Sequence, residues 1–413
     1  MFDTPTDVQP PVATGPVPDP ATDSATVLER IESLVDLYAA NGPVNERLGR
    51  LTDEVAERVK WTGVARMLQP KRYGGLESHP VEFMEAVLAT GAADGATGWV
   101  AGVVGVHPHE LAQADDRLQQ ELWAENPDTW IASPYAPMGI ATPVDGGYQF
   151  TGHWKFSSGT DHCQWVMIGG FVANPDGSPD RADVRHFCLP RKDYEIIEDS
   201  WDVIGLRGTG SKDLIVRDVF VPDYRVIAQD EINAGTAAKA LGLDSPLYAI
   251  PRSVMFSGAV ATGTLAIAQG ALAAAIAFAG KRVGMGGQKA SGDPYQLATI
   301  GHAAAEIESA VIQMKTDFSR VYDRAAAGEV ITFDERLRVA RNQAASTHRA
   351  LAAVDDLFLH AGGGSLHLDQ PLQRFWRDMH SGMNHIVNVA EPKHRAWTLD
   401  HYGVEASALG IKV

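Results

Sequence analysis

The chain is poor in cysteine and in positive charge. Its 413 residues include two cysteines, Cys163 and Cys188, and neither has a companion at metal-finger spacing. Two thiols cannot build a disulfide framework, so we interpret both as reduced. Basic residues number 35 against 52 acidic ones, and the net charge of -17 opposes binding to a phosphate backbone. These shortages argue against zinc fingers, disulfide-rich folds and nucleic-acid partners.

Membrane signals also look absent from the sequence. We expect no apolar run as long as the roughly 18 to 20 residues that cross a bilayer. The amino terminus is acidic and rich in proline, with no basic segment leading into an apolar one. The sequence therefore predicts a cytoplasmic protein without a membrane partner. Its 45% hydrophobic content is ample for buried cores, and its length predicts two or three domains.

Three regions of different character follow a polar start. Residues 1–24 have frequent prolines and no periodic apolar positions, which predicts a disordered tail. Residues 25–128 have helical spacing of apolar residues and predict an N-terminal all-α domain. Short β-branched and aromatic runs in residues 129–235 predict a central β-barrel. Residues 236–413 predict a C-terminal four-helix bundle and tail, with helices near residues 252–283, 294–327, 333–361 and 371–389.

Two segments of the β-region combine strand patterning with small polar residues. Residues 148–165, YQFTGHWKFSSGTDHCQW, alternate aromatic and polar side chains before a Ser-Ser-Gly loop. Residues 201–222 place GLRGTGS between two strand-like runs. No helix follows this glycine cluster, and GGGS at 362–365 lacks the lysine of a phosphate loop, so neither predicts ordinary NAD or ATP binding. The alternative reading is that both clusters are merely turns.

The order of these regions resembles the acyl-CoA dehydrogenase fold, an α+β architecture. Within that fold, residues 131–165, 203–222 and 371–385 resemble the oxygenase halves of two-component, reduced-flavin-dependent aromatic hydroxylases. They look most like the 3-hydroxy-9,10-secoandrostatrienedione 4-hydroxylases of bacterial steroid degradation. Hydroxylases of 4-hydroxyphenylacetate share the same parts. The resemblance covers nearly everything after residue 25.

The resemblance implies a flavin held by the loops of the barrel. Hydroxyls and backbone amides suit this role, because they satisfy the flavin's carbonyls and phosphate without adding a charge beside the ring. The candidate contacts are Trp154, Ser157, Ser158, Thr209 and Ser211. The resemblance further implies reduced FMN, with FAD as the alternative, supplied by a separate NAD(P)H-dependent flavin reductase. O2 is then the co-substrate.

Arg282 closes the first predicted bundle helix. In the resembled family an arginine here meets the flavin phosphate, or its neighbourhood, across a subunit boundary. This implies a homotetramer with the bundles at its centre. The alternative is an arginine that interacts favourably with the helix dipole.

The expected place of a dehydrogenase base holds no carboxylate. In many acyl-CoA dehydrogenases the base follows an arginine-aspartate pair, but after Arg377-Asp378 no Asp or Glu occurs through residue 390. His385 lies four residues after Ser381 and seven after Asp378, which predicts one shared helix face. A histidine also suits a phenol, because its base must work near neutral pH.

His107 ends the apolar run GWVAGVVGV, where the resembled hydroxylases place a histidine against the substrate hydroxyl. Taken alone, it reads as a core histidine. The resemblance implies that His107 orients or deprotonates a phenol, Ser158 stabilises a flavin hydroperoxide and His385 assists proton movement. The product of this ortho-hydroxylation is a catechol. The alternatives are an acyl-CoA dehydrogenase with its base elsewhere, a nitrogen- or sulfur-oxidising flavin monooxygenase of this fold, and a scaffold without flavin.

Overall fold

The first region is a group of helices. The structure is a computed structural model and describes residues 20–282 and 292–404. Most of the expected disordered tail therefore lies outside the described residues. Asp23 caps the first helix by accepting a hydrogen bond from the backbone N–H of Thr26. The helices are α1 (Ser24–Leu48), α2 (Asp53–Thr62), α3 (Pro80–Ala93), α4 (Gly95–Leu111) and α5 (Asp116–Trp123).

The central region forms one eight-stranded sheet. Its hydrogen-bonded order is β6-β7-β3-β2-β4-β5-β8, and β1 pairs with β4 in parallel. Phe150, Trp154 and Phe187 are fully buried aromatic residues of this sheet. The strands are β1 (Ile131–Ala132), β2 (Gly139–Val144), β3 (Gly147–Ser157), β4 (Trp165–Ala173), β5 (Pro179–Pro190), β6 (Glu195–Ile197), β7 (Lys212–Pro222) and β8 (Val226–Ala228).

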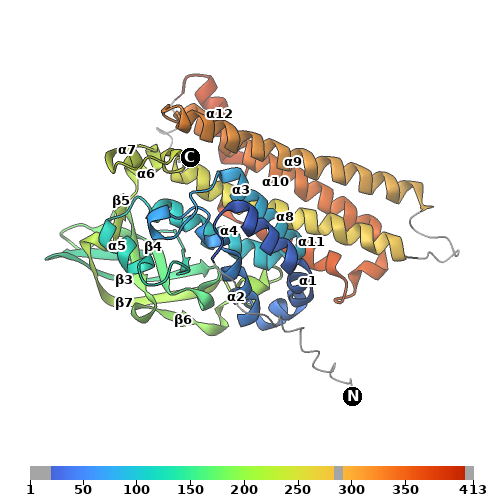
Figure 1. Cartoon of the computed structure of the whole chain (residues 1–413), viewed down its shortest axis with the longest axis horizontal. Coiled ribbons are helices and arrows are strands. Elements are labelled where there is room, and N and C mark those ends of the chain that lie inside the picture. Colours follow the sequence, from blue (N-terminus) through green and yellow to red (C-terminus); the bar gives the residue numbers. More distant parts are fainter. Residues whose placement is uncertain (1–19, 283–291, 405–413) are drawn as a thin grey trace, which may run out of the picture.

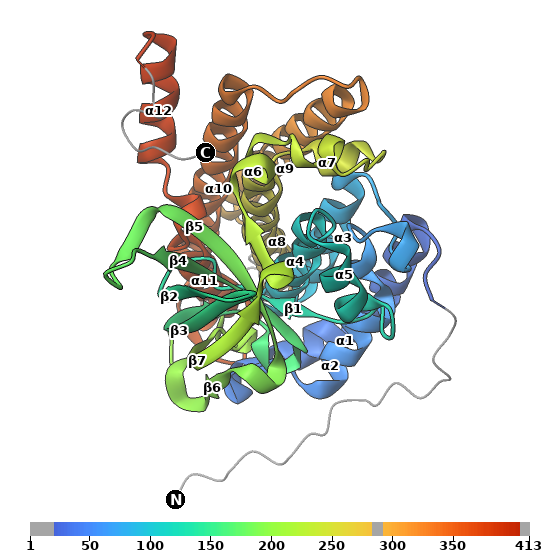
Figure 2. The same ribbon diagram turned by 90° about the vertical axis from the view of Figure 1, so that its left-hand side faces the viewer.

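The last region begins with two short helices and continues as a long bundle. In Figure 1 the bundle helices extend away from the sheet, and Figure 2 shows α4 and α8 between the strands and the remaining N-terminal helices. The helices are α6 (Asp230–Ala234), α7 (Ala237–Ala240), α8 (Arg252–Lys281), α9 (Pro294–Ala326), α10 (Phe333–Ala361), α11 (Pro371–Met383) and α12 (Glu391–His401). The fourth bundle helix is therefore shorter than the expected 371–389.

Helix α8 corrects one expectation from the sequence. Its 30 residues are long and apolar enough to cross a membrane by length and composition, with a mean hydropathy of 1.6 over the best 18-residue window. The expectation of no such segment was therefore wrong. The physical reason for its apolar character lies in packing, because 72% of that window is buried inside the structure. A central helix of a helical core passes the same test.

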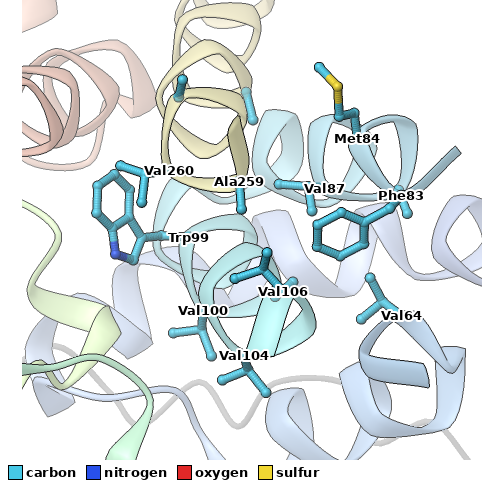
Figure 3. Packing of buried hydrophobic residues seen from close by; sticks show 14 of the residues in the cluster. Val64, Phe83, Met84, Val87, Trp99, Val100, Val104, Val106, Ala259 and Val260 are labelled. Carbon is cyan, nitrogen blue, oxygen red and sulfur yellow. The ribbon is translucent and has the colours of Figure 1, made fainter. Parts of the chain in front are cut away.

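Small residues let α3, α4 and α8 approach closely. Figure 3 shows Val87, Trp99 and Ala259, from these three helices, in one apolar cluster. A Cβ on Gly98 would lie 2.2 Å from the Cα of Gly91, so the two helices meet backbone to backbone there. This close contact fixes α4, which carries both Trp99 and His107.

We expect Gly98→Ala to lower the free energy of unfolding by about 2 kcal/mol, because the new methyl group meets rigid backbone. A urea titration at fixed protein concentration measures this change. Gly263→Ala in α8 is the matched control, since its Cβ would meet nothing closer than 3.5 Å. That variant should be neutral or slightly stabilised by its better helix propensity. Equal stability of the two variants would contradict the close approach.

Candidate active site

A cavity of about 430 Å³ lies between the sheet and the helices. Its wall combines apolar rings with neutral polar groups, and among the described residues that line it none is an aspartate or glutamate. Lys155 is the one lysine or arginine among the described residues of this lining. The lining residues are Trp99, Val103, Ser133, Pro134, Tyr135, Ala136, Lys155, Phe156, Ser158, Trp201, Leu206, Ser211, Phe256, Ser381, Asn384, His385 and Ile386.

A β-bulge at the end of β3 directs Ser158 into this cavity. Trp154 pairs with Leu214 and Ser157 with Lys212, so two residues of β3 oppose one residue of β7. Phe156, within the bulge, has a φ of +66°, a left-handed conformation that is unusual for a bulky side chain. The bulge re-aims the chain, and Phe156 and Ser158 both line the cavity.

Two other predicted flavin contacts of β3 lie in the interior of the sheet. Trp154 is fully buried and donates its indole N–H to the carbonyl oxygen of Gly169 at 2.7 Å. The Ser157 side chain is also fully buried, and its Oγ has no hydrogen-bond partner among the described residues. Neither residue lines the cavity, so their contact with a flavin stays a prediction.

The loop before β7 completes a chain of three hydroxyl groups. The Oγ atoms of Ser158 and Ser211 are 2.7 Å apart, and Ser211 Oγ is 2.7 Å from Thr209 Oγ1. The backbone N–H of Gly159 donates to the carbonyl oxygen of Thr209 at 2.8 Å, which joins the two loops. Ser158 and Ser211 line the cavity and Thr209 lies behind them. The structure therefore brings together three of the predicted flavin contacts.

This second loop is held from behind by α11. Leu206 has a φ of +54°, and its backbone N–H donates to a carboxylate oxygen of Asp378 at 2.6 Å. A Cβ on Gly205 would lie 2.3 Å from the carbonyl oxygen of Arg377, so only glycine fits against the helix there. Burial raises the pKa of Asp378 to about 7, although the Leu206 N–H acts in the opposite direction. Asp378 therefore supports the loop and does not line the cavity.

His107 lies directly behind the side chains that line the cavity. Its Nε2 is 2.7 Å from Ser133 Oγ, and its Nδ1 is 2.9 Å from Tyr135 Oη. Both partners line the cavity, whereas the imidazole is fully buried and is not part of the wall. Burial lowers the pKa of His107 to about 3, so the ring is neutral. It therefore reaches the cavity through Ser133 and Tyr135.

His385 lines the cavity, but the predicted helix face does not exist. Helix α11 ends at Met383, because the buried side chain of Asn388 donates to the carbonyl oxygen of Gly382 at 2.9 Å and turns the chain. His385 begins the next turn, and its Nδ1 accepts the backbone N–H of Val387 at 3.2 Å. The neutral ring then carries its proton on Nε2. Burial lowers the pKa of His385 to about 4.

Ring contacts connect the two predicted catalytic histidines. The centroids of His107 and Tyr135 are 5.5 Å apart, those of Tyr135 and Phe256 are 4.7 Å apart, and those of Phe256 and His385 are 6.2 Å apart. His385 also meets Trp99 edge-on at 5.9 Å. The two histidines therefore lie at the ends of one row of rings.

Arg282 lies elsewhere in the chain. Its guanidinium donates to the carbonyl oxygen of Ala361, and it lines a separate hollow at the end of the bundle with Phe278 and Pro371. The structure does not bring it to the candidate site within one chain. The loop that follows it, residues 283–291, is outside the described residues. Its predicted contact with flavin across a subunit boundary stays a prediction.

Comparison with known proteins places the chain. Residues 255–390 match the acyl-CoA dehydrogenase C-terminal domain family. The chain is 45% identical to a pigment production hydroxylase of Rhodococcus erythropolis, over 92% of this chain and 97% of that protein. It is 40% identical to the oxygenase subunit HsaA, a flavin-dependent monooxygenase of Mycobacterium tuberculosis, over 89% of this chain and 93% of HsaA. The chain belongs to the oxygenase components of two-component flavin-dependent monooxygenases.

Further comparisons agree with this family and with the acyl-CoA dehydrogenase fold. A crystal structure of HsaA from M. tuberculosis superimposes with a TM-score of 0.87 at 39% identity, covering 92% of this chain and 98% of that one. The FADH2-dependent resorcinol hydroxylase oxygenase component of a Rhizobium species is 30% identical, over 90% of this chain and 92% of that protein. The predicted fold class, enzyme class and family are confirmed.

Several lining residues of this oxygenase component were not predicted from its sequence. Ser133 and Tyr135 lie in the irregular segment after β1, where no periodic pattern identifies an inward face. Trp201 and Phe256 also line the cavity, from the loop before β7 and from α8. The sequence offered one signal for them, the presence of aromatic residues near the recognised motifs. That signal does not distinguish residues that line the cavity from residues buried in the core.

Proposed function

We propose that this oxygenase component hydroxylates a phenol ortho to its hydroxyl group and forms a catechol. It would use reduced FMN, with reduced FAD as the alternative, delivered by a separate NAD(P)H-dependent flavin reductase. The secosteroid phenol of the resembled group is the leading substrate. The observation that carries the proposal is a largely apolar cavity lined by serine hydroxyls and the imidazole of His385, with His107 behind Ser133 and no carboxylate among the described lining residues.

The chemistry of one side of the cavity fits a reduced flavin. Ser158 and Ser211 offer neutral hydroxyls that can donate or accept, backed by Thr209. The rings of Phe156 and Trp201 meet at 6.0 Å beside these hydroxyls and provide apolar surface for a flat ring system. When bound, reduced flavin supplies the electrons that activate O2. The protein's part is to hold the ring, exclude water and place hydroxyls beside it.

A second group of lining residues fits a phenol. Ser133 places its hydroxyl at the wall, and its contact with the neutral His107 ties it to a fixed imidazole. The nearby rings of Tyr135 and Phe256 suit an aromatic substrate. His385, with a proton on Nε2, can donate a hydrogen bond within the same cavity. Each group is uncharged, so a phenol enters without desolvating an ionised partner.

One experiment tests the proposal and separates it from acyl-CoA dehydrogenation. The protein is incubated with a panel of phenols, a general flavin reductase, NADH, FMN and isotopically labelled O2, and products are analysed by mass spectrometry. We expect one labelled oxygen atom in a catechol product. The control adds acyl-CoA esters to protein with oxidised flavin. Flavin bleaching by an ester, without labelled product from any phenol, would support the dehydrogenase alternative.

The proposed assembly is a homotetramer in which Arg282 reaches the flavin of a neighbouring chain. Arg282 lines a different hollow from the cavity, so within one chain it does not reach the proposed flavin site. Exposed apolar residues on the bundle also support an assembly. Ile312 on α9 is 55% exposed and Leu359 on α10 is 75% exposed. Such residues are common where helices pack against another subunit. Sedimentation velocity measures the assembly directly.

A further inference from the structure

Tyr135 occupies an unusual position between the cavity and a buried polar cluster. One face of its ring stacks on His186, with centroids 4.4 Å apart and planes 13° apart. The edge of Phe256 packs against the ring as well, at 4.7 Å. Its hydroxyl is directed to Nδ1 of His107 at 2.9 Å. Tyr135 therefore touches the cavity, the buried imidazole and the sheet at once.

The backbone at Tyr135 is equally constrained. A Cβ on Gly169 of β4 would lie 2.1 Å from the carbonyl oxygen of Tyr135, so the segment lies directly on the strand. The N–H of Gly169 donates to the carbonyl oxygen of Pro134 at 3.3 Å. Since both backbone and ring are held, the hydroxyl has little freedom to leave His107.

The cluster behind Tyr135 holds the buried carboxylate of Glu110 beside an imidazole and a guanidinium. His186 Nδ1 is 2.6 Å from a carboxylate oxygen of Glu110, which also accepts from Gln229 at 2.8 Å. The guanidinium of Arg252 lies 3.9 Å from the other carboxylate oxygen and 5.1 Å from the centre of the Tyr135 ring. Although burial acts against it, His186 and Arg252 hold the pKa of Glu110 down, to about 2. Glu110 is therefore an anion next to Tyr135.

Burial and the neighbouring anion together keep Tyr135 protonated. Burial and then the charge of Glu110 raise the pKa of Tyr135 well above its usual value, so its hydroxyl keeps its hydrogen. A neutral imidazole has one donor and one acceptor nitrogen. If Tyr135 donates to Nδ1, the ring proton of His107 must lie on Nε2, where it points at Ser133.

We propose that Tyr135 is a positioning residue for the reaction, which holds His107 in one tautomer by donating to its Nδ1. The inference rests on the proposed function. Ser133 then accepts the Nε2–H of His107, and its own hydroxyl hydrogen remains to donate to the oxygen of a phenol in the cavity. A donor at this point favours the ionised phenol, which is the more electron-rich form. His186 and Glu110 contribute by holding the Tyr135 ring and its proton.

The decisive variant is Tyr135→Phe, because it keeps the ring packed on His186 and Phe256 and removes one hydroxyl. The full-length chain is titrated with 4-nitrophenol across a range of pH, and the absorbance of the bound nitrophenolate gives its apparent pKa. Loss of the ordered Ser133 donor to the phenolate, a hydrogen bond of about 1 kcal/mol, is expected to raise that apparent pKa by about 0.7 unit. The matched control is Tyr248→Phe, which removes a buried hydroxyl that bonds the carbonyl oxygen of Leu68 at 3.3 Å and lies outside the cavity.

A second measurement needs no phenol. In protein labelled with 15N-histidine, the His107 ring signals are assigned by comparison with His107→Gln. We expect the proton on Nε2 in the wild type and a mixture of tautomers in Tyr135→Phe. A proton on Nδ1 in the wild type would mean that Tyr135 accepts the hydrogen bond, and would overturn the inference.

The two measurements separate failure of the inference from failure of the proposed function. An unchanged probe pKa in Tyr135→Phe overturns the positioning role, and leaves the phenol site intact. If the wild type binds 4-nitrophenol nowhere and hydroxylates no phenol, the proposed function is wrong and the positioning role for this reaction falls with it. An unchanged pKa in Tyr248→Phe, with a raised one in Tyr135→Phe, supports both.

Discussion

Replacing Ser158 with alanine is expected to lower kcat for phenol hydroxylation about 100-fold, the typical cost of removing one aligned donor from an active site. Ser158 lines the cavity, and its Oγ is 2.7 Å from that of Ser211. Without it, the hydroxyl chain ends at Ser211 and the wall beside the proposed flavin loses one of its two hydroxyl groups. Oxygen consumption should continue, because reduced flavin reacts with O2 without this group. The missing product should therefore appear as hydrogen peroxide.

The measurement compares catechol formed with NADH consumed and peroxide released. Ser157→Ala is the comparison variant, because it makes the same change at the adjacent residue. The Ser157 hydroxyl is fully buried in the sheet and has no hydrogen-bond partner among the described residues. Geometry therefore predicts a much smaller loss of coupling than for Ser158→Ala. Similar losses in both variants would show that the sequence-based assignment of both serines as contacts was the better guide.

The two serines show what the sequence could and could not predict. Strand alternation and the Ser-Ser-Gly loop identified the segment that meets the cavity. They could not say which serine faces it, because a bulge changes the alternation at Lys155 and Phe156. The bulge depends on a positive φ at Phe156, which no residue preference predicts. The segment is therefore readable from sequence, whereas the direction of each hydroxyl needs the three-dimensional pairing of β3 with β7.

The end of α11 was unpredictable for a related reason. Gly382 lies inside the helix and the next proline is Pro392, so the pattern predicted a helix through residue 389. The chain turns at Met383 because Asn388 reaches back to the carbonyl oxygen of Gly382 and to Thr264 of α8. That tertiary contact overrides the local pattern. His385 still reaches the cavity, but from a turn.

Ser133 and Tyr135 escaped prediction because topology, and not local pattern, brings them to the site. Strand β1 pairs in parallel with β4, with Ile131 opposite Trp165, and this pairing carries the irregular segment to the cavity. By contrast, the order of helices, strands and bundle follows from hydrophobic spacing, which depends on each segment alone. Which distant strands pair with each other cannot be predicted from the spacing of residues in one sequence.

Asp378 gives the second large effect, on stability. The residue is 4% exposed, and burial raises the pKa of its carboxyl group from 3.8 to about 7. Between these two values the folded chain binds a proton that the unfolded chain has already lost. The free energy of unfolding should therefore fall as the pH rises through this window, with the full cost reached above about pH 7. This is the reverse of the usual carboxylate, which is stabilised in its ionised form.

We expect Asp378→Asn to remove this dependence. The amide oxygen can still accept the Leu206 N–H, so the loop that lines the cavity keeps its support. Relative to wild type, the variant should gain about 3 kcal/mol in free energy of unfolding between about pH 5 and about pH 8.5, which corresponds to two pKa units. Urea titrations at the two pH values measure the difference. Asp356→Asn, at an exposed position of α10, is the control and should show no such gain.

The alternative is that Asp378 is ionised in the folded protein at both pH values. Arg374 and Arg377 both act to lower the pKa of Asp378, while Asp94 acts to raise it. In the alternative case, Asp378→Asn gives the same stability difference from wild type at both pH values. The two guanidinium groups then outweigh burial, and the carboxyl group is ionised at both pH values. Asp378 would then hold the Leu206 loop through a charged hydrogen bond, and removing its charge should cost stability at both pH values. The sign of the change at alkaline pH therefore decides between a neutral and an ionised support for the cavity wall.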